Sequence, residues 1–295
     1  VYLCDGKVYK RLDVNDNAVI AWAAATGTLP ADGDGNVARM IALWRGRIVL
    51  SGVKNDPQNW FMSRSYDATD WNYAATDAQA AVAGNASDAG LMGDRVTALV
   101  PFGDDFLLVG GDHSLWLMNG DPADGGAIDN VSRSIGIVGP EAFAYHPDGS
   151  VFFVASDGLY RMSPGAQPLC ISANRLDQFF GTINLTTRRV LLLWDMRRHG
   201  LHVFIAPTTA VAVTHLYWDE RTDSFWHDQY PANIGPTAVL SYDDDDPDRA
   251  LPLLGGFDGY MRHITSAASD DGAPITSRVV YSPLAASPDE RVLLR

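Results

Sequence analysis

The chain has 295 residues, of which 46% are hydrophobic and 20% are charged, a composition that excludes an intrinsically disordered protein. No apolar run approaches the roughly 20 residues of a membrane-spanning helix, so no membrane span is expected. The formal net charge of −14 argues against sequence-specific nucleic-acid binding, because neutralising phosphates requires a basic face. Cys4 and Cys170 are the only cysteines, which is too few for a disulfide scaffold or a cysteine metal site.

The N-terminal region predicts strands separated by turns. A hairpin is expected at 1–12, with Asp5–Gly6 in its turn, and a partner strand at 18–25. The following loop contains Asp32–Asn36, which resembles the opening of a calcium loop but lacks the distal Glu of such a loop. A solvated loop is therefore favoured over a metal site.

Short apolar strands then alternate with turns. A hairpin is expected at 40–51. Ser65–Trp71 resembles an aspartate-box turn of sialidase-type propellers, one residue short in its spacing and without the box glycine. Such a turn is structural and says little about catalysis. The small and polar residues of 74–93 predict a linker or a surface insertion.

The central stretch, 95–162, reads as two consecutive copies of one unit in which apolar strands alternate with acidic or glycine turns. Runs rich in Val, Phe, Tyr and Leu, broken at short intervals by Gly, Asp and Pro, are typical of consecutive antiparallel hairpins. The segment 121–130 is expected to be a long turn between repeated units.

The closing hairpin of this unit recurs along the chain. Three copies carry an Asp-Gly turn, and looser copies precede three tryptophans, which makes six in all. The acidic residues lie roughly 35 to 65 residues apart, close to the ~40–50 residue period of propeller blades. We therefore predict an all-β, six-bladed β-propeller, with five or seven blades as the alternatives. The Asp-Gly pairs are Asp5 with Gly6, Asp157 with Gly158, and Asp258 with Gly259.

These Asp-Gly turns are predicted to be structural. Glycine adopts positive φ at little steric cost, and a short acidic side chain in a turn accepts hydrogen bonds from nearby backbone amides. Equivalent turns of different blades lie too far apart to share a ligand.

The second half of the chain predicts two more blades and a closing strand. A crossing is expected at 172–187, a fifth blade at 189–227 and a sixth at 233–264. One strand, 275–283, is then left over and is expected to complete the first blade, which closes the ring and removes an exposed edge. The propeller would span 1–284, and 285–295 would begin a strand that leads to a further domain.

Signals for catalysis are weak. The chain contains seven His but only three Glu, and its Asp residues lie in turns. No Ser-His-Asp spacing, phosphate loop or zinc motif is present. We therefore predict a non-enzymatic protein with no catalytic residues, no metal and no cofactor.

Tryptophans offer an alternative function. Those inside apolar strands are interpreted as packing between blades, whereas Trp60, Trp71 and Trp226 lie near turns and could stack on sugars if exposed. A carbohydrate-binding, lectin-like receptor-binding module is therefore the alternative function, and a glycosidase is less favoured.

Residues 41–284 also resemble a family. The pattern includes Arg95–Phe102, Ile135–Pro140 and Val151–Tyr160, and it continues through Leu253–Tyr260. It is similar to the propellers of virion proteins from tailed bacteriophages, with tail-nozzle and tail-hub proteins of short-tailed phages as the nearest analogy. These motifs are blade-packing motifs, so they specify architecture better than role.

This resemblance implies a structural part of a phage tail, located in the virion and assembled around the DNA exit path. Its implied partners are other phage tail proteins and further copies of itself in a homo-oligomeric ring. A host-surface glycan would be a further partner if the lectin-like alternative holds.

Overall fold

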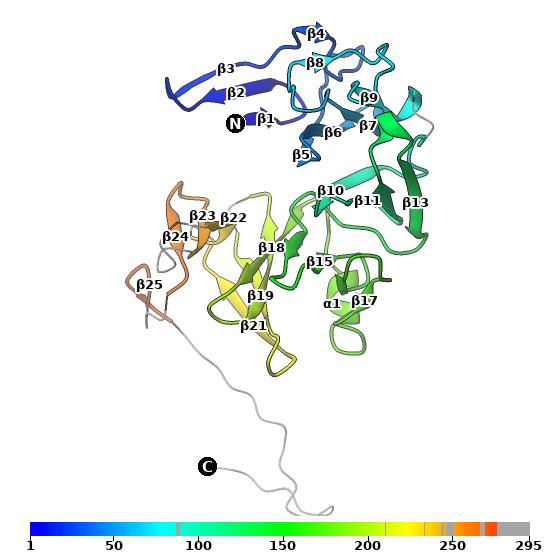
Figure 1. Ribbon diagram of the computed structural model, residues 1–295. Coiled ribbons are helices and arrows are strands. Elements are labelled where there is room, and N and C mark those ends of the chain that lie inside the picture. Colours follow the sequence, from blue (N-terminus) through cyan, green and yellow to red (C-terminus); the bar gives the residue numbers. More distant parts are fainter. Residues whose placement is uncertain are drawn as a thin grey trace, which may run out of the picture.

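The protein is an all-β, six-bladed β-propeller. The computed structural model describes residues 1–86, 89–209, 211–232, 234–242, 245, 251–265 and 269–275. Its six main sheets are antiparallel meanders in which each strand pairs with the next strand of the same sheet. Figure 1 shows these sheets following one another in chain order around a common centre.

The first three blades contain the N-terminal half of the chain. Two short segments, β4 (Thr26–Gly27) and β8 (Asp70–Trp71), form a separate parallel pair that links the first two blades. The strands are β1 (Tyr2–Cys4), β2 (Tyr9–Asp13) and β3 (Ala18–Ala21) in blade 1; β5 (Met40–Trp44), β6 (Arg47–Val53), β7 (Asp56–Met62) and β9 (Val82–Ala83) in blade 2; and β10 (Val96–Phe102), β11 (Phe106–Gly111), β12 (Leu115–Asn119) and β13 (Ala127–Ser132) in blade 3.

The last three blades follow the same meander. The helices of the described residues are short: η1 (Gly84–Ala86), η2 (Pro122–Asp124) and α1 (Asp177–Gly181), the last at the predicted crossing into blade 5. The strands are β14 (Phe143–Tyr145), β15 (Val151–Val154), β16 (Leu159–Met162) and β17 (Leu169–Cys170) in blade 4; β18 (Arg188–Asp195), β19 (Gly200–Pro207), β20 (Val213–Asp219) and β21 (Ser224–Tyr230) in blade 5; β22 (Pro236–Tyr242), β23 (Leu251–Gly256) and β24 (Met261–His263) in blade 6; and a small hairpin of β25 (Ser269–Asp270) and β26 (Ala273–Pro274).

The hydrophobic core lies between neighbouring blades. Every residue of β6 and β19 is buried, which means that both faces of these second strands pack against protein. The first strands converge at the centre, where β5 lies beside β10, and β18 lies between β14 and β22. Phe152 of blade 4 stacks on Trp194 of blade 5 with ring centroids 5.6 Å apart, so aromatic contacts join blades that hydrogen bonds within a sheet cannot join.

Two predicted connections each contain part of a strand. The expected linker at 74–93 contains β9, which pairs with β7, and the expected turn at 121–130 contains the start of β13, which pairs with β12. Both are outer fourth strands, and their small or polar residues carry no apolar alternation. Pairing with an already formed hairpin, and not hydrophobic patterning, places them in the sheet.

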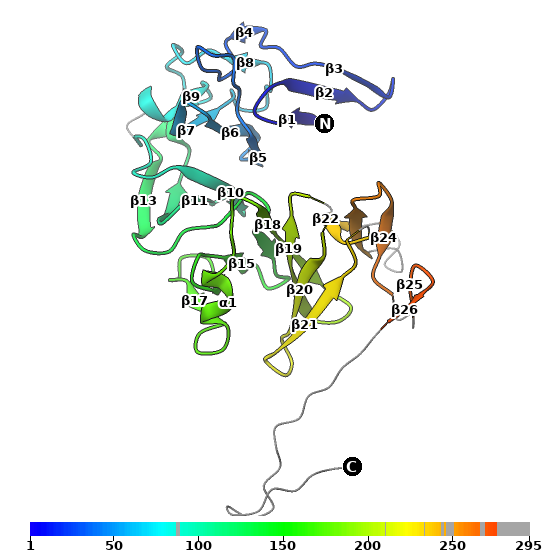
Figure 2. The same ribbon diagram turned by 180° about the vertical axis from the view of Figure 1, so that it is seen from behind.

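The predicted closure of the ring falls mostly outside the described residues. Of the strand expected at 275–283, only Ile275 is described, and 285–295 lies wholly outside. Blades 1 and 6 each have three strands within the described part of the chain. They occupy the two ends of the arc of blades in Figures 1 and 2.

The Asp-Gly turns are of two kinds. Gly6 and Gly259 have φ values of 85° and 81°, as predicted, and Asp5 and Asp258 accept hydrogen bonds from the amides of Lys7 and Tyr260 respectively. The middle copy differs, and its prediction was wrong on both counts.

Glycine in the middle turn is required because neighbouring side chains lie too close for a Cβ. Gly158 is not among the residues with positive φ. A Cβ at this position would lie 2.7 Å from Ser172 Oγ and 2.8 Å from Cys170 Sγ. Asp157 accepts a hydrogen bond from the Tyr160 hydroxyl at 2.7 Å. Glycine is therefore needed here because the neighbouring strand β17 approaches closely.

Substitutions should separate these two causes. Gly259→Ala should lower the free energy of unfolding by about 1 kcal/mol because its φ is left-handed, and Gly259→Asn should cost less because Asn tolerates that region. Gly158→Ala should cost roughly 1–3 kcal/mol through overpacking, and Gly158→Asn should cost more than Gly158→Ala. Urea unfolding of the four variants measures both orders. The same order at both sites would contradict the distinction.

Candidate functional site

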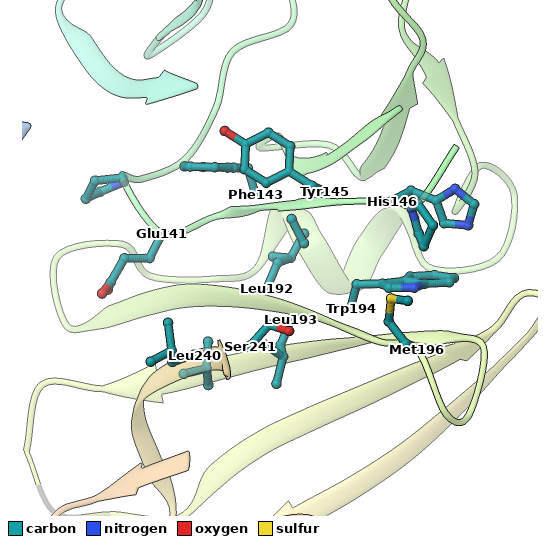
Figure 3. Close-up of a pocket in the computed structure, with 14 residues that line it drawn as sticks. Glu141, Phe143, Tyr145, His146, Leu192, Leu193, Trp194, Met196, Leu240 and Ser241 are labelled. Atoms are coloured by element: carbon teal, nitrogen blue, oxygen red, sulfur yellow. The ribbon is translucent and has the colours of Figure 1, made fainter. Parts of the chain in front are cut away.

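A pocket of about 630 Å³ lies at the centre of the propeller, between the first strands of blades 4, 5 and 6. We call it the axial pocket (Figure 3). Its walls come from β14, β18 and β22, three inner strands that are far apart in the sequence. The lining residues are Pro140, Glu141, Phe143, Ala144, Tyr145, His146, Pro147, Leu192, Leu193, Trp194, Met196, Val239, Leu240 and Ser241.

The middle of the axial pocket is apolar. Phe143 and Tyr145 pack edge to face, with ring centroids 5.6 Å apart, and the Tyr145 hydroxyl donates to Pro101 O at 2.7 Å. That hydrogen bond fixes the tyrosine ring while leaving 48% of the residue exposed. Figure 3 shows Leu240 across the pocket from these aromatic residues, and Trp194 and Met196 at one end.

Large apolar side chains of the axial pocket stay exposed. Leu240 and Met196 are 58% and 63% exposed. Exposed apolar surface that lines a pocket commonly marks a place where a ligand or partner binds. The axis is thus the apolar face that the fold leaves uncovered.

Charged groups stand at both ends of the axial pocket. Glu141 lies at one end, 3.8 Å from the guanidinium of Arg189. At the other end the His146 ring lies between two carboxylates, with Nδ1 2.6 Å from Asp148 and Nε2 3.3 Å from Glu220. Arg161 bridges the same pair, at 2.6 Å from Asp148 and 3.1 Å from Glu220.

This cluster ties blade 4 to blade 5, because Glu220 belongs to the β20–β21 turn. Burial opposes ionisation of Asp148, but hydrogen bonds from Ser150 and His146, together with the nearby Arg161, hold its pKa well below the usual value. The carboxylate is therefore charged at neutral pH and completes the ion pair. The Ser150 hydroxyl is buried and itself donates to Asp148 at 2.7 Å.

Both nitrogens of His146 face carboxylates, and the buried Ser150 hydroxyl is already hydrogen-bonded to Asp148. Within the described residues, no group of three or more His, Cys, Asp or Glu side chains is arranged to hold a metal ion. No helix in the described part of the chain is long and apolar enough to span a membrane.

The three tryptophans proposed for glycan stacking have different surroundings. Trp60 and Trp71 are fully buried, and their indole N–H groups donate to Gly90 O and Ala68 O, so neither presents a ring face to a sugar. Trp226 on β21 is 63% exposed. The sequence interpretation missed the axial residues because an inner strand and a second strand have the same apolar composition.

Comparisons with known proteins give a fold. No protein-family model matches the chain, and no curated protein matches it. Among solved structures, the extracellular domain described as that of a hybrid two-component system from Bacteroides thetaiotaomicron has a TM-score of 0.53 at 11% identity, covering 95% of this chain and 34% of that one. A protein described as a 6-phosphogluconolactonase from Bacteroides uniformis has a TM-score of 0.50 at 8% identity, covering 88% and 78% of the two chains.

A third structure, an auxiliary nutrient binding protein from Bacteroides ovatus, has a TM-score of 0.46 at 10% identity and covers 90% of this chain and 66% of that one. The chain spans about a third of the length of the two-component-system domain. Structural similarity at identities this low shows the propeller architecture and does not assign a function.

A buried chain of titratable groups lies in blade 5. His202 Nε2 is 3.4 Å from Asp195, and His202 Nδ1 is 2.8 Å from His215 Nε2. All three residues are buried. Asp195 also accepts the amide hydrogens of Arg197 and Arg198. Although burial opposes ionisation of Asp195, these hydrogen bonds and the one from His202 lower its pKa.

The ionised carboxylate orders the protons along this chain. A charged Asp195 accepts from His202 Nε2, which makes His202 Nδ1 an acceptor for the N–H of His215 Nε2. His215 Nδ1 is then left unprotonated, and it has no hydrogen-bond partner among the described residues. Burial lowers the pKa of His202, with Asp195 opposing the shift, and lowers the pKa of His215 well below its usual value.

These shifts predict acid sensitivity. Histidines in the unfolded chain gain protons below about pH 6.5, and the folded state resists protonation of His202 and His215. Stability should therefore fall as the pH drops from 7 to 5, by up to about 1.4 kcal/mol per pH unit for each histidine. Asp195 contributes little in this window, since unfolded aspartate titrates near 4. Urea unfolding at several pH values measures the slope.

Matched variants test whether the pH dependence of the unfolding free energy comes from the histidines of blade 5. His215→Gln retains a hydrogen-bond donor toward His202 but cannot titrate, so its unfolding free energy should depend less steeply on pH. His113→Gln, at an exposed position between β11 and β12, should keep the wild-type slope. An equal slope in His215→Gln and wild type would contradict the assignment.

Proposed function

We propose that this chain is a non-enzymatic binding propeller that holds its ligand in the axial pocket. The observation that carries the proposal is the continuous exposed apolar surface on inner strands from three blades, at Tyr145, Met196 and Leu240. Folding alone would favour covering such surface, because burying apolar area contributes about 25 cal/mol per Å². A ligand with an apolar face supplies that cover.

Electrostatics and chemistry support binding without turnover. The groups at the ends of the pocket already have partners: Glu141 lies 3.8 Å from Arg189, and His146 lies beside Asp148. A ligand seated between them contacts mainly carbon, so orientation would come from the polar ends. Measurable turnover of a glycoside by purified protein would overturn the non-enzymatic assignment.

Carbohydrate binding is a second candidate function. The exposed ring of Trp226 favours it, because an aromatic face can stack on a sugar. A solved propeller of similar architecture is the extracellular domain of a hybrid two-component system from Bacteroides thetaiotaomicron, which supports a binding role by analogy.

The phage-tail assignment remains a prediction. It rests on the sequence resemblance of residues 41–284 to tail-nozzle and tail-hub propellers, and the solved structures named above include no virion protein. A ring-shaped assembly in a virion would use the exposed axis or rim for contacts between tail proteins. Locating this chain in an image of an intact phage particle tests that assignment, and its absence from every particle would refute it.

A charged side chain in the axial pocket should weaken binding there. The probe is 8-anilinonaphthalene-1-sulfonate, whose fluorescence rises when it enters an apolar site. Wild type should bind the dye saturably, and Leu240→Asp should weaken binding at least tenfold, because it places a carboxylate on the pocket wall facing the aromatic residues. Fluorescence titration measures the affinity.

The matched control is Leu169→Asp on the outer strand β17. Leu169 is exposed to a similar degree, at 66%, but does not line the pocket, so the variant should bind the dye as wild type does. Equal weakening in the two variants, or no saturable binding by wild type, would contradict the proposal.

A further inference from the structure

A second pocket, separate from the axial pocket, lies between blades 1 and 2. Its volume is about 750 Å³, which is within the range of small-molecule sites. One wall is apolar, with Ile41 and Leu43 of β5, and the opposite side carries Tyr66, Asp67 and Thr69 from the turn that precedes β8. We call this the Tyr66 pocket.

Tyr66 is held in an unusual conformation. Its φ is 59°, a left-handed value that is an outlier for a bulky residue. The Tyr66 amide donates to Gly46 O at 2.7 Å. The phenol ring lies against Gly46 so closely that a Cβ there would be 2.7 Å from the ring. Because Gly46 has no side chain, part of the Tyr66 ring can lie directly against its backbone.

The Tyr66 ring contributes little to folding. Tyr66 is 89% exposed, so the ring buries almost no apolar surface. A solvent-facing aromatic ring beside a pocket offers a face on which a ligand can stack.

Polar groups beside the ring define the class of ligand. The exposed carboxylate of Asp67 accepts from the amide and the hydroxyl of Thr69, both at 2.8 Å, and these hydrogen bonds lower its pKa. An ionised carboxylate has about four acceptor positions, so it retains capacity for ligand hydroxyls. An aromatic face next to a charged hydrogen-bond acceptor matches a sugar ring, which offers C–H groups on its face and hydroxyls at its edge.

Charge indicates whether the saccharide is neutral or acidic. Arg64, whose charge acts on Asp67, is paired with Asp77 at 2.9 Å, and the protein as a whole carries a formal charge of −14. An acidic sugar would meet repulsion from Asp67 and from this overall negative charge. We propose that the Tyr66 pocket binds a neutral saccharide, with Tyr66 as the stacking platform and Asp67 as the hydrogen-bond acceptor.

The test uses the whole chain on an array of neutral and acidic glycans. Wild type should bind neutral glycans in preference to sialylated or uronic-acid glycans. The affinity for the best neutral glycan, measured by calorimetry, should fall at least tenfold in Tyr66→Ala and in Asp67→Asn. Tyr66→Phe should retain binding, since it keeps the ring face.

Controls separate the site from the fold and from the axial pocket. Tyr66→Asn supplies a residue that tolerates left-handed φ, so loss of binding in a variant with unchanged thermal unfolding assigns the effect to the ring. Tyr260→Ala removes another largely exposed tyrosine and should bind as wild type. Leu240→Asp should lose the dye but keep the glycan, which makes failure of this proposal distinguishable from failure of the axial site.

Four outcomes would overturn the proposal: no neutral glycan bound by wild type, unchanged affinity in Tyr66→Ala, a preference for acidic glycans, or loss of binding that follows Trp226→Ala instead. The last outcome would move the saccharide site to the outer strand of blade 5.

Discussion

Burial of both faces of each sheet is the constraint on which the propeller depends. The residues of β6 and β19 are buried without exception, so a blade needs a neighbour on each side. A single blade of about 30 to 50 residues could not bury enough surface to fold alone, and stacking blades makes one continuous core. Contacts such as Phe152 on Trp194 are therefore the source of stability, and the hydrogen bonds within each sheet supply its local geometry.

The same constraint determines where ligands can bind. The two faces of a blade pack against its neighbours. The surfaces that remain for a ligand are the inner strands at the axis and the turns at the rim. The axial pocket lies at the inner strands, and the Tyr66 pocket combines the inner strand β5 with the turn before β8. Each contains a residue that packing does not require: Leu240 is a large apolar side chain that stays exposed, and Tyr66 adopts a left-handed backbone that folding alone disfavours.

The architecture could be predicted from the sequence because it repeats. Turn residues at recurring spacing gave the six blades, and two of the three Asp-Gly turns have the expected geometry. The outer strands β9 and β13 could not be predicted, since partner strands and not apolar periodicity place them. The requirement for Gly158 was also hidden, because it depends on Ser172 and Cys170, which only folding brings within 3 Å of the missing Cβ.

Site residues were harder to predict for the same physical reason. Exposure is a property of the assembled ring, so Trp60, Trp71 and Trp226, all near turns in the sequence, differ completely in the fold: two are sealed between strands and one is open to solvent. Tyr66 lies inside the segment interpreted as a structural turn, and that interpretation concealed it. The Trp71 indole holds this turn by donating to Ala68 O, so one segment both packs the core and presents the exposed ring.

The polar groups of the turns and of the axial pocket already have partners, which supports the proposed binding function. Asp5 and Asp258 are engaged by backbone amides, and His146 lies between two carboxylates. A ligand that hydrogen-bonds to one of these groups must replace the partner that the group already has, and a buried polar atom left without a partner costs about 1–3 kcal/mol. The aromatic and aliphatic groups at the two pockets bear no such cost. They are the parts of this molecule that can exchange water for a ligand without dismantling the interactions that join the blades.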